Sequence, residues 1–316
     1  MSTPPPDFLI VGVQKGGSYW LTSLLDAHPE IRCFPSRPGQ ADGTGEAHLF
    51  DILARLETDY PRFRKSMSTK LGGWFADLVP RRPPATAEAR DALVWSIRAR
   101  FDEYCQQQRM TAGKPVVGEK TTETVHHPEL VEKLYPGIRK VCILRDPRDR
   151  VVSFFFHQQR KGRLADGERL SRAHVQAYVE RVRQDYAGLV RLAGPLHVLT
   201  YERLSTAPHD EASRLLEFLH VDASSPVVER IVRAAAFERL AGRPQGQADA
   251  TSHFRQGAPG DWPNHLPAGL AAEMLGALDE PTRRIEAQFG LDLSAYREPV
   301  AWMAPDGAPE EPAHES

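Results

Sequence analysis

A short apolar segment followed by a glycine-rich turn constrains the fold of this chain most strongly. Residues 8–13 are apolar and rich in β-branched side chains, which is typical of a strand buried in a parallel sheet. The turn QKGGS follows, and residues 20–25 read as a helix. Gly16 and Gly17 let the backbone turn tightly, so that successive N–H groups can point at phosphate oxygens. The helix start adds a positive dipole end and Lys15 adds a full charge, so the stretch predicts a site for a phosphate-like group.

This turn differs from the P-loop of nucleotide triphosphatases, G-x-x-x-x-G-K-[ST]. The chain offers Gly12, Gly17 and Ser18, but no lysine follows Gly17, and Lys15 precedes Gly16 and Gly17. In a nucleotide triphosphatase the late lysine reaches the β- and γ-phosphates, and the adjacent hydroxyl holds Mg²⁺. That arrangement is not available here. Taken alone, the stretch also fits a tight strand-to-helix turn with an incidental lysine.

Composition narrows the class of protein. The chain has 316 residues, of which 41% are hydrophobic, so it is long enough to bury a core. Its formal charge of −2 argues against a general nucleic-acid binder, so any anion recognition must be local. The three cysteines lack metal-ligand spacing, and Cys142 lies in an apolar run, where we expect a core residue. No run approaches a membrane span and the first residues do not resemble a signal peptide, so we expect a soluble, cytoplasmic protein.

Strand and helix patterns alternate along the chain. We expect strands at 8–13, 116–119, 138–144 and 196–200, and helices at 20–25, 59–71, 87–108, 128–135, 148–160, 171–192, 211–219, 226–238 and 267–289. This alternation predicts an α/β fold, a single P-loop-like domain with a central parallel sheet flanked by helices. The domain is expected to span residues 1–296. Residues 36–45 are expected to form a flexible loop, and residues 297–316 a flexible, proline-rich tail.

A second anion site is predicted where the strand at 138–144 ends. Arg145 follows this strand directly, at the edge where open α/β sheets bind ligands. Ser153 lies eight positions further on, in the next helix. An arginine fork with a hydroxyl suits a phosphate group. For Arg148 and Arg150 we expect salt bridges with the neighbouring aspartates, which would stabilise the strand–helix corner.

Three segments together resemble the sulfotransferase family that uses 3′-phosphoadenosine 5′-phosphosulfate (PAPS). GVQKGGSYWL resembles the family's 5′-phosphosulfate loop, LRDPRDRVVSFFFH its 3′-phosphate segment, and FRQGAPGDW its C-terminal R-K-G-x-x-G-D-W loop. They occur in the family's order, and a glutamine replaces the usual lysine of the last motif. The resemblance implies the sulfotransferase fold, and adenosine 3′,5′-bisphosphate (PAP) as product. It also implies that the donor is bound by Lys15, Gly16, Gly17, Ser18, Tyr19, Trp20, Arg145, Ser153, Arg255, Gln256 and Gly257.

Two more segments resemble the branch of this family that sulfates carbohydrates such as heparan sulfate. GEAHLF at 45–50 resembles its K-E-x-H-F-F stretch, and GEKT at 118–121 resembles its E-K-T-P stretch. Gly45 stands where that branch often has lysine, and Thr122 where it usually has proline. This resemblance implies an acceptor with a free hydroxyl, either a small molecule or a glycan.

The residues of these segments suit the chemistry of sulfuryl transfer. By analogy with phosphoryl transfer, positioning and charge stabilisation dominate. Lys15 and the N–H groups of the loop would stabilise the leaving bisphosphate, each charge-assisted hydrogen bond contributing about 1.5–3 kcal/mol. Glu46 is the candidate general base for the acceptor, and His48 is the alternative. Lys120 either neutralises the transferring group or pairs with Glu119. These cations would replace a metal, so no metal is expected.

Several alternatives stay open at this point. A small-molecule kinase of the P-loop type lacks its late lysine, and Asp146 is the only candidate for holding Mg²⁺. A non-catalytic nucleotide-binding protein is the third class. We expect Trp20 and Trp262 to pack, and the pair at 126–127 to lie on the surface. The acceptor pocket is expected from residues 36–45, 59–84 and 161–172, whose composition does not select an acceptor, O- or N-sulfation, or an oligomeric state.

Overall fold

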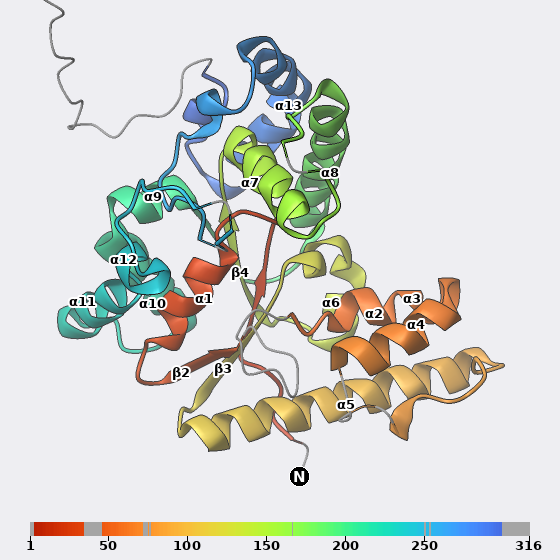
Figure 1. Cartoon of the computed structure of the whole chain (residues 1–316). Helices are drawn as coiled ribbons and strands as arrows, with labels where there is room; N and C mark the ends of the chain where they lie inside the picture. The colour runs from red at the N-terminus through yellow and green to blue at the C-terminus, as the bar shows by residue number, and fades with distance from the viewer. Residues whose placement is uncertain are drawn as a thin grey trace, which may run out of the picture.

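The computed structural model describes residues 3–34, 46–71, 75, 77–165, 167–249, 251–252 and 254–298. Its centre is a five-stranded sheet in the order β2-β3-β1-β4-β5, in which all neighbouring strands pair in parallel (Figure 1). The predicted parallel sheet is therefore confirmed. Because β1 lies between β3 and β4, the turns that follow these three strands meet at one edge of the sheet. The strands are β1 (Phe8–Val11), β2 (Ile31–Phe34), β3 (Val116–Thr121), β4 (Arg139–Leu144) and β5 (Leu196–Thr200).

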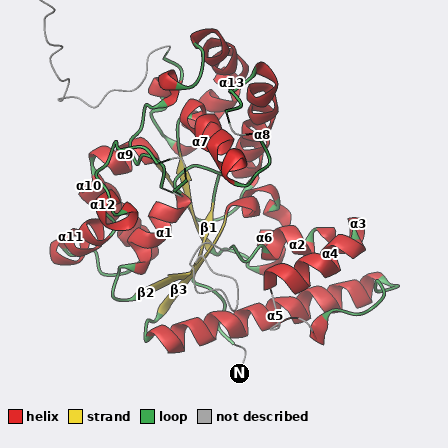
Figure 2. Cartoon of the chain, viewed as in Figure 1, coloured by secondary structure: helices red, strands yellow, loops and turns green. Residues whose placement is uncertain are grey.

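Helices cover both faces of the sheet, as Figures 1 and 2 show. Helices α1 and α9 to α12 lie on one side, α5, α6 and α2 to α4 on the other, and α7, α8 and α13 beyond the upper end of the sheet in this view. The helices are α1 (Ser18–Asp26), α2 (Leu49–Leu53), α3 (Arg55–Thr58), α4 (Tyr60–Ser66), α5 (Ala87–Ala112), α6 (Pro128–Leu134), α7 (Pro147–Arg160), α8 (Arg172–Arg191), α9 (Tyr201–Thr206), α10 (Pro208–Leu219), α11 (Ser225–Ala234), α12 (Phe237–Ala241) and α13 (Ala268–Phe289).

Two hydrophobic cores lie on opposite faces of the sheet, because alternate side chains of a strand point to opposite faces. In β1, Leu9 belongs to one core and Ile10 to the other. The first core packs the sheet against α5, α8 and α13, and the second packs it against α1, α10 and α11. In β4, Cys142 is fully buried in the first core, as expected.

Local sequence explains where the main helices begin and end. Helix α7 has Pro147 in its first turn, where a proline lacks only an N–H that has no helical partner anyway. Helix α5 starts after Thr86, whose side chain accepts a hydrogen bond from the N–H of Ala89 at 3.2 Å. The same helix ends at Gly113, which is left-handed with φ 63°.

Some elements differ from the prediction. The helix expected at 59–71 ends as an α-helix at Ser66 and continues as a π-helical turn over Met67–Leu71. The helix expected at 226–238 is divided into α11 and α12. Strand β2 was not predicted, since four residues at the edge of a sheet, one of them Arg32, carry little hydrophobic pattern. Helix α9 was not predicted either.

The histidine pair at 126–127 is not on the surface, so that prediction is wrong. Both residues are half-buried in or next to the 3₁₀ turn Thr122–His126, which follows β3. The Nε2 atom of His126 lies 3.2 Å from an oxygen of Asp185 in α8. Packing of this turn against α8 therefore covers a segment that reads as polar in the sequence.

The loop expected at 36–45 and the tail from residue 299 onward lie outside the described residues. Of the expected tail, Arg297 pairs with Glu286, and the carbonyl oxygen of Glu298 accepts a hydrogen bond from Arg148. Within the described ranges, no helix is long and apolar enough to cross a membrane. Those same residues contain no group of three His, Cys, Asp or Glu side chains arranged to hold a metal ion.

Candidate active site

A cavity of about 700 Å³ lies where β1, β3, β4 and β5 end. Its walls come from the turn after β1, the turn after β3, helix α7, helix α9 and the segment at 254–257. Lys15 and Arg145 therefore border one cavity, although they are 130 positions apart in the sequence. Of the residues predicted to bind the donor or act in catalysis, the cavity is lined by Lys15, Gly17, Ser18, Tyr19, Trp20, Glu46, His48, Arg145, Ser153, Arg255, Gln256 and Gly257.

The turn after β1 is held in a shape that needs its glycines. Gly17 is left-handed with φ 107° and caps α1, and a Cβ there would lie 2.7 Å from the ring of Tyr201. Gly16 does not line the cavity: a Cβ on it would lie 2.4 Å from the carbonyl oxygen of Ile143, and its own N–H donates to Val13 at 3.1 Å. Gly16 therefore lets the turn pack against β4. The first N–H groups of α1 lack helical partners and belong to residues that line the cavity.

Lys15 has an unusual backbone and an unusual charge environment. It is left-handed with φ 66°, a conformation that few residues other than glycine adopt. Burial, together with the nearby charges of Arg160 and Lys120, lowers the pKa of Lys15 to about 7. The cavity disfavours the charged form of Lys15. An anionic ligand would favour that charged form, so the cavity suits an anion.

Glu46 is held by residues of β3 and of the turn after it. The ammonium group of Lys120 donates to Glu46 Oε1 at 2.6 Å, and the hydroxyl of Thr122 donates to Oε2 at 3.2 Å. Lys120 does not line the cavity; it is fully buried, with its ammonium 3.6 Å from the ring centroid of Tyr19. Burial alone would raise the pKa of Glu46, but the charge of Lys120 holds it below its usual value.

Lys120 does not pair with Glu119, so that alternative is wrong. Neighbouring residues on a strand point to opposite faces, and the carboxylate of Glu119 accepts a hydrogen bond from Thr121 at 2.5 Å. Burial raises the pKa of Glu119 to about 8. Glu46 is therefore the carboxylate that balances the buried Lys120.

His48 connects Glu46 to an aspartate that sequence reasoning did not select. The residue is left-handed, with φ 58°, and its Nε2 atom lies 3.8 Å from Glu46 Oε2. Its Nδ1 atom lies 3.1 Å from Asp51 Oδ1, and Asp51 also contacts Arg55 at 3.1 Å. In the sequence, the spacing of three residues between His48 and Asp51 is the signal that could have indicated this contact. Both candidate bases are thus oriented by buried neighbours.

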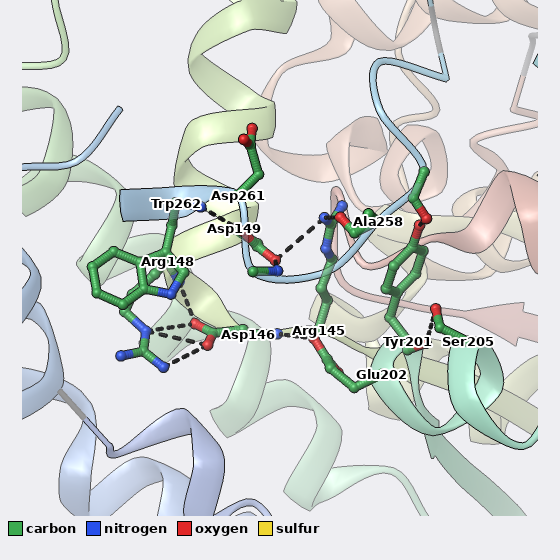
Figure 3. Close-up of polar contacts among 12 residues, drawn as sticks. Arg145, Asp146, Arg148, Asp149, Tyr201, Glu202, Ser205, Ala258, Asp261 and Trp262 are labelled. Atoms are coloured by element: carbon green, nitrogen blue, oxygen red, sulfur yellow. Dashed lines mark hydrogen bonds and ion pairs between the residues drawn. The ribbon is translucent and has the colours of Figure 1, made fainter. Parts of the chain in front are cut away.

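Arg145 occupies the corner after β4 (Figure 3). Its Nη2 atom lies 3.4 Å from Asp149 Oδ2 and donates to the carbonyl oxygen of Ala258 at 3.2 Å. The guanidinium carbon lies 4.3 Å from the ring centroid of Tyr201. Burial alone would lower the pKa of Arg145, but Asp149 and other acidic neighbours raise it. Tyr201 was missed in the sequence, although its place directly after β5 matches that of Arg145 after β4.

Arg148 and Arg150 both form buried salt bridges, but only Arg148 pairs with a neighbouring aspartate as expected; for Arg150 that prediction is wrong. Arg148 Nη2 lies 2.6 Å from Asp146 Oδ2, and Arg150 pairs with Asp185 of α8 and not with an aspartate of its own segment. Arg150 also donates to the carbonyl oxygen of Gln14 at 3.1 Å. Neither Arg148 nor Arg150 lines the cavity. Asp146, the kinase alternative's candidate for Mg²⁺, is held by Arg148 and buried.

The segment 254–262, which we call the closing loop, covers the cavity next to Arg145. Arg255 pairs with Asp261, and its guanidinium carbon lies 4.9 Å from the ring centroid of Phe156. The amide of Gln256, turned with its nitrogen toward Asp261, also donates to that carboxylate at 2.7 Å. Trp262 is buried and packs under Arg148, as expected of a packing residue.

Two buried guanidinium atoms at this end of the cavity have no partner. In the part of the chain that the structure describes, Arg145 Nε and Arg255 Nε are buried and make no hydrogen bond. A buried donor without a partner is costly, and an anion is the ligand that such donors favour. Part of the cavity lining is apolar. Trp20, whose Nε1 donates to the carbonyl oxygen of Ala235 at 2.9 Å, lines the cavity, and so do Leu24, Leu204, Val232 and Phe237.

Comparison with known proteins identifies the family. A family model described as "Sulfotransferase domain" matches residues 5–284, so this chain belongs to the sulfotransferase family. Cytosolic sulfotransferase 17 of Arabidopsis thaliana is 28% identical over 180 residues, which are 48% of this chain and 51% of that protein. Cytosolic sulfotransferase 16 of the same plant is 25% identical over 170 residues, 46% of this chain and 50% of that protein. The chain spans about half the length of these curated relatives.

Solved structures show the same fold. The sulfotransferase from Alicyclobacillus acidocaldarius superposes with a TM-score of 0.54 at 20% identity, covering 93% of this chain and 100% of that chain. Mouse sulfotransferase SULT7A1, complexed with PAP, gives a TM-score of 0.57 at 16% identity, covering 94% of this chain and 91% of that chain. The predicted sulfotransferase fold is therefore confirmed.

Proposed function

We propose that this protein is a sulfotransferase that moves the sulfuryl group of PAPS to a hydroxyl of a small molecule or glycan. The observation that carries the proposal is that Lys15, Arg145 and Glu46 line one cavity. About 700 Å³ is within the usual range for small-molecule sites. Family membership and the mouse neighbour complexed with PAP support PAPS as the sulfate donor.

The two ends of the cavity suit the two phosphate groups of this donor. Lys15 and the first N–H groups of α1 would bind the 5′-phosphosulfate and stabilise the bridging oxygen as it leaves. Arg145, Ser153 and Arg255 would bind the 3′-phosphate, and the unpaired Nε donors of both arginines support this assignment. Trp20 and the apolar side chains beside it would then lie near the adenine ring.

Glu46 is our proposed general base. Its lowered pKa keeps it ionised at neutral pH, and Lys120 fixes one carboxylate oxygen while the other lies toward His48. Glu46 would take the proton of the acceptor hydroxyl as that oxygen attacks the sulfur atom. His48 is the alternative base, since Asp51 orients its ring in the same way that an acid orients a catalytic histidine.

A kinase reaction has less support. The lysine of this turn precedes its glycines, and Asp146 is engaged by Arg148 at 2.6 Å and is buried. The compartment that we propose is the cytoplasm, because both curated relatives are called cytosolic.

Calorimetry with PAP and with ATP–Mg²⁺ tests the donor. Tighter binding of PAP supports the proposal, and tighter binding of ATP–Mg²⁺ contradicts it. Turnover is then tested by incubating the protein with PAPS and an acceptor library and searching by mass spectrometry for products with an added sulfate. The Lys15→Met variant is the control, because sulfated products that persist at the same level do not come from this site.

A further inference from the structure

We propose that Asp149 is a positioning residue that ties the closing loop to Arg145, so that Arg145 and Arg255 meet the same 3′-phosphate. This inference rests on the proposed function, since it concerns the binding of the donor. Asp149 lies in the first turn of α7, outside the cavity, and its side chain is 1% exposed. It would act only through the two arginines, not by touching the nucleotide.

Both carboxylate oxygens of Asp149 are used for this connection. Oδ2 accepts from the backbone N–H of Gly260 at 2.7 Å, and Oδ1 accepts from the N–H of Trp262 at 3.0 Å (Figure 3). The same Oδ2 lies 3.4 Å from Arg145 Nη2. One buried carboxylate therefore contacts the strand-end arginine and two backbone positions of the closing loop.

The simpler interpretation is that Asp149 caps its own helix. An acidic residue in the first turn does favour a helix, through the dipole. The side chain that caps α7 is however Asp146, which accepts from the N–H of Arg148 at 2.8 Å. Asp149 instead accepts from backbone N–H groups 111 and 113 positions away and from the side chain of Arg145. Its contacts are those of a link between two segments.

The link reaches Arg255 through Asp261, at the C-terminal end of the closing loop. Arg255 pairs with Asp261. Asp261 lies between Gly260 and Trp262, whose N–H groups both donate hydrogen bonds to Asp149. Gly260, at one of those contacts, is left-handed with φ 83°, so the loop turns sharply there. Loss of the carboxylate would free the loop at Gly260 and Trp262 and leave Arg145 without its acidic partner. Both changes would weaken the grip on a 3′-phosphate and spare the 5′ end.

The test compares two nucleotides that differ only in the 3′-phosphate. For wild type and Asp149→Asn, calorimetry measures the affinity of PAP and of adenosine 5′-phosphate. We expect the substitution to weaken PAP binding at least about tenfold, with the affinity for adenosine 5′-phosphate changed by less than about twofold. Asp149→Glu keeps the charge but shifts the carboxylate, so it should also weaken PAP binding while leaving the affinity for adenosine 5′-phosphate nearly unchanged. It replaces the asparagine variant if that variant does not fold.

Asp91→Asn is the matched control, because Asp91 makes an exposed salt bridge with Lys133. It should leave both affinities unchanged. Amide hydrogen exchange of residues 254–262 should become faster in Asp149→Asn and stay the same in the control. An equal loss for both nucleotides, or an unchanged PAP affinity, would overturn the positioning role. A wild-type protein that binds PAP no tighter than adenosine 5′-phosphate would instead overturn the proposed function.

Discussion

The ammonium group of Lys120 lies 2.6 Å from Oε1 of Glu46, although 74 positions separate the two residues in the sequence. Lys120 is on β3 and fully buried, so the packing around it fixes the position of its ammonium group. Glu46 precedes α2 and borders the cavity. Lys120 thus holds the carboxylate of Glu46 at the cavity that Lys15 also lines. The role of Glu46 can be tested by substitutions at either residue of the pair.

Replacing Glu46 with glutamine should abolish most transfer without removing the donor. The amide keeps the shape of the carboxylate but cannot accept a proton from the acceptor, so we expect kcat to fall about 10²–10⁴-fold. The affinity for PAP should change by less than about threefold. Steady-state kinetics and calorimetry measure the two quantities. The parallel variant His48→Gln should lose less activity, and full activity in Glu46→Gln would remove Glu46 from the mechanism.

The Lys120→Met variant tests the same pair through its pH dependence. Lys120 holds the pKa of Glu46 below its usual value, against the effect of burial. A base acts when it is deprotonated, so activity is present above the pKa of Glu46 and is lost as the pH falls through it. Without Lys120 that pKa rises, and the acid limb of the kcat/KM profile should move to higher pH. An acid limb at the same pH in both proteins would argue against Glu46 as the base.

Donor binding should take up a proton at Lys15. The pKa of this lysine is about 7 in the free protein, so at pH 8 roughly a tenth of the molecules carry its charge. An anionic ligand favours the charged form, so binding of PAP at pH 8 should take up roughly 0.9 proton. The affinity should be highest below pH 7 and should fall as the pH rises. Calorimetry in buffers of different ionisation enthalpy measures the uptake, which should disappear in Lys15→Met.

Gly16→Ala should destabilise the protein. The added methyl group would lie 2.4 Å from the carbonyl oxygen of Ile143, which is backbone and cannot move aside easily. We expect a loss of about 1–3 kcal/mol in the free energy of unfolding, measured in urea. Gly276→Ala is the control, because nothing lies within 4 Å of its Cβ position in α13. It should be neutral or stabilising by up to about 1 kcal/mol. Equal effects of the two substitutions would contradict the packing role of Gly16.

The sequence predicts best those features that depend on neighbouring residues. The sequence predicts the strands β1 and β4, the turn at 14–18 and the long helix α5. Strand burial, glycine conformation and helix periodicity depend on residues that are consecutive in the sequence. The arrangement of Lys15 and Arg145 followed from one further rule, that parallel strands end at a common edge.

The contacts that complete the site depend on pairs that are far apart in the sequence. Nothing near Lys120 indicates that Glu46 will be its partner, and nothing near Asp149 indicates that it will hold the closing loop. Arg150 pairs with Asp185 of α8, although two nearer aspartates were available. These pairings are decided by how helices pack on the sheet, which a periodic pattern does not specify.

The central claim is that one nucleotide bridges Lys15 and Arg145. Calorimetry should compare PAP, adenosine 5′-phosphate and adenosine 3′-phosphate on wild type, Lys15→Met and Arg145→Met. We expect wild type to bind PAP at least about tenfold tighter than either monophosphate. Arg145→Met should remove the preference of PAP over adenosine 5′-phosphate, and Lys15→Met its preference over adenosine 3′-phosphate. Preferences that persist unchanged in both variants would contradict the account.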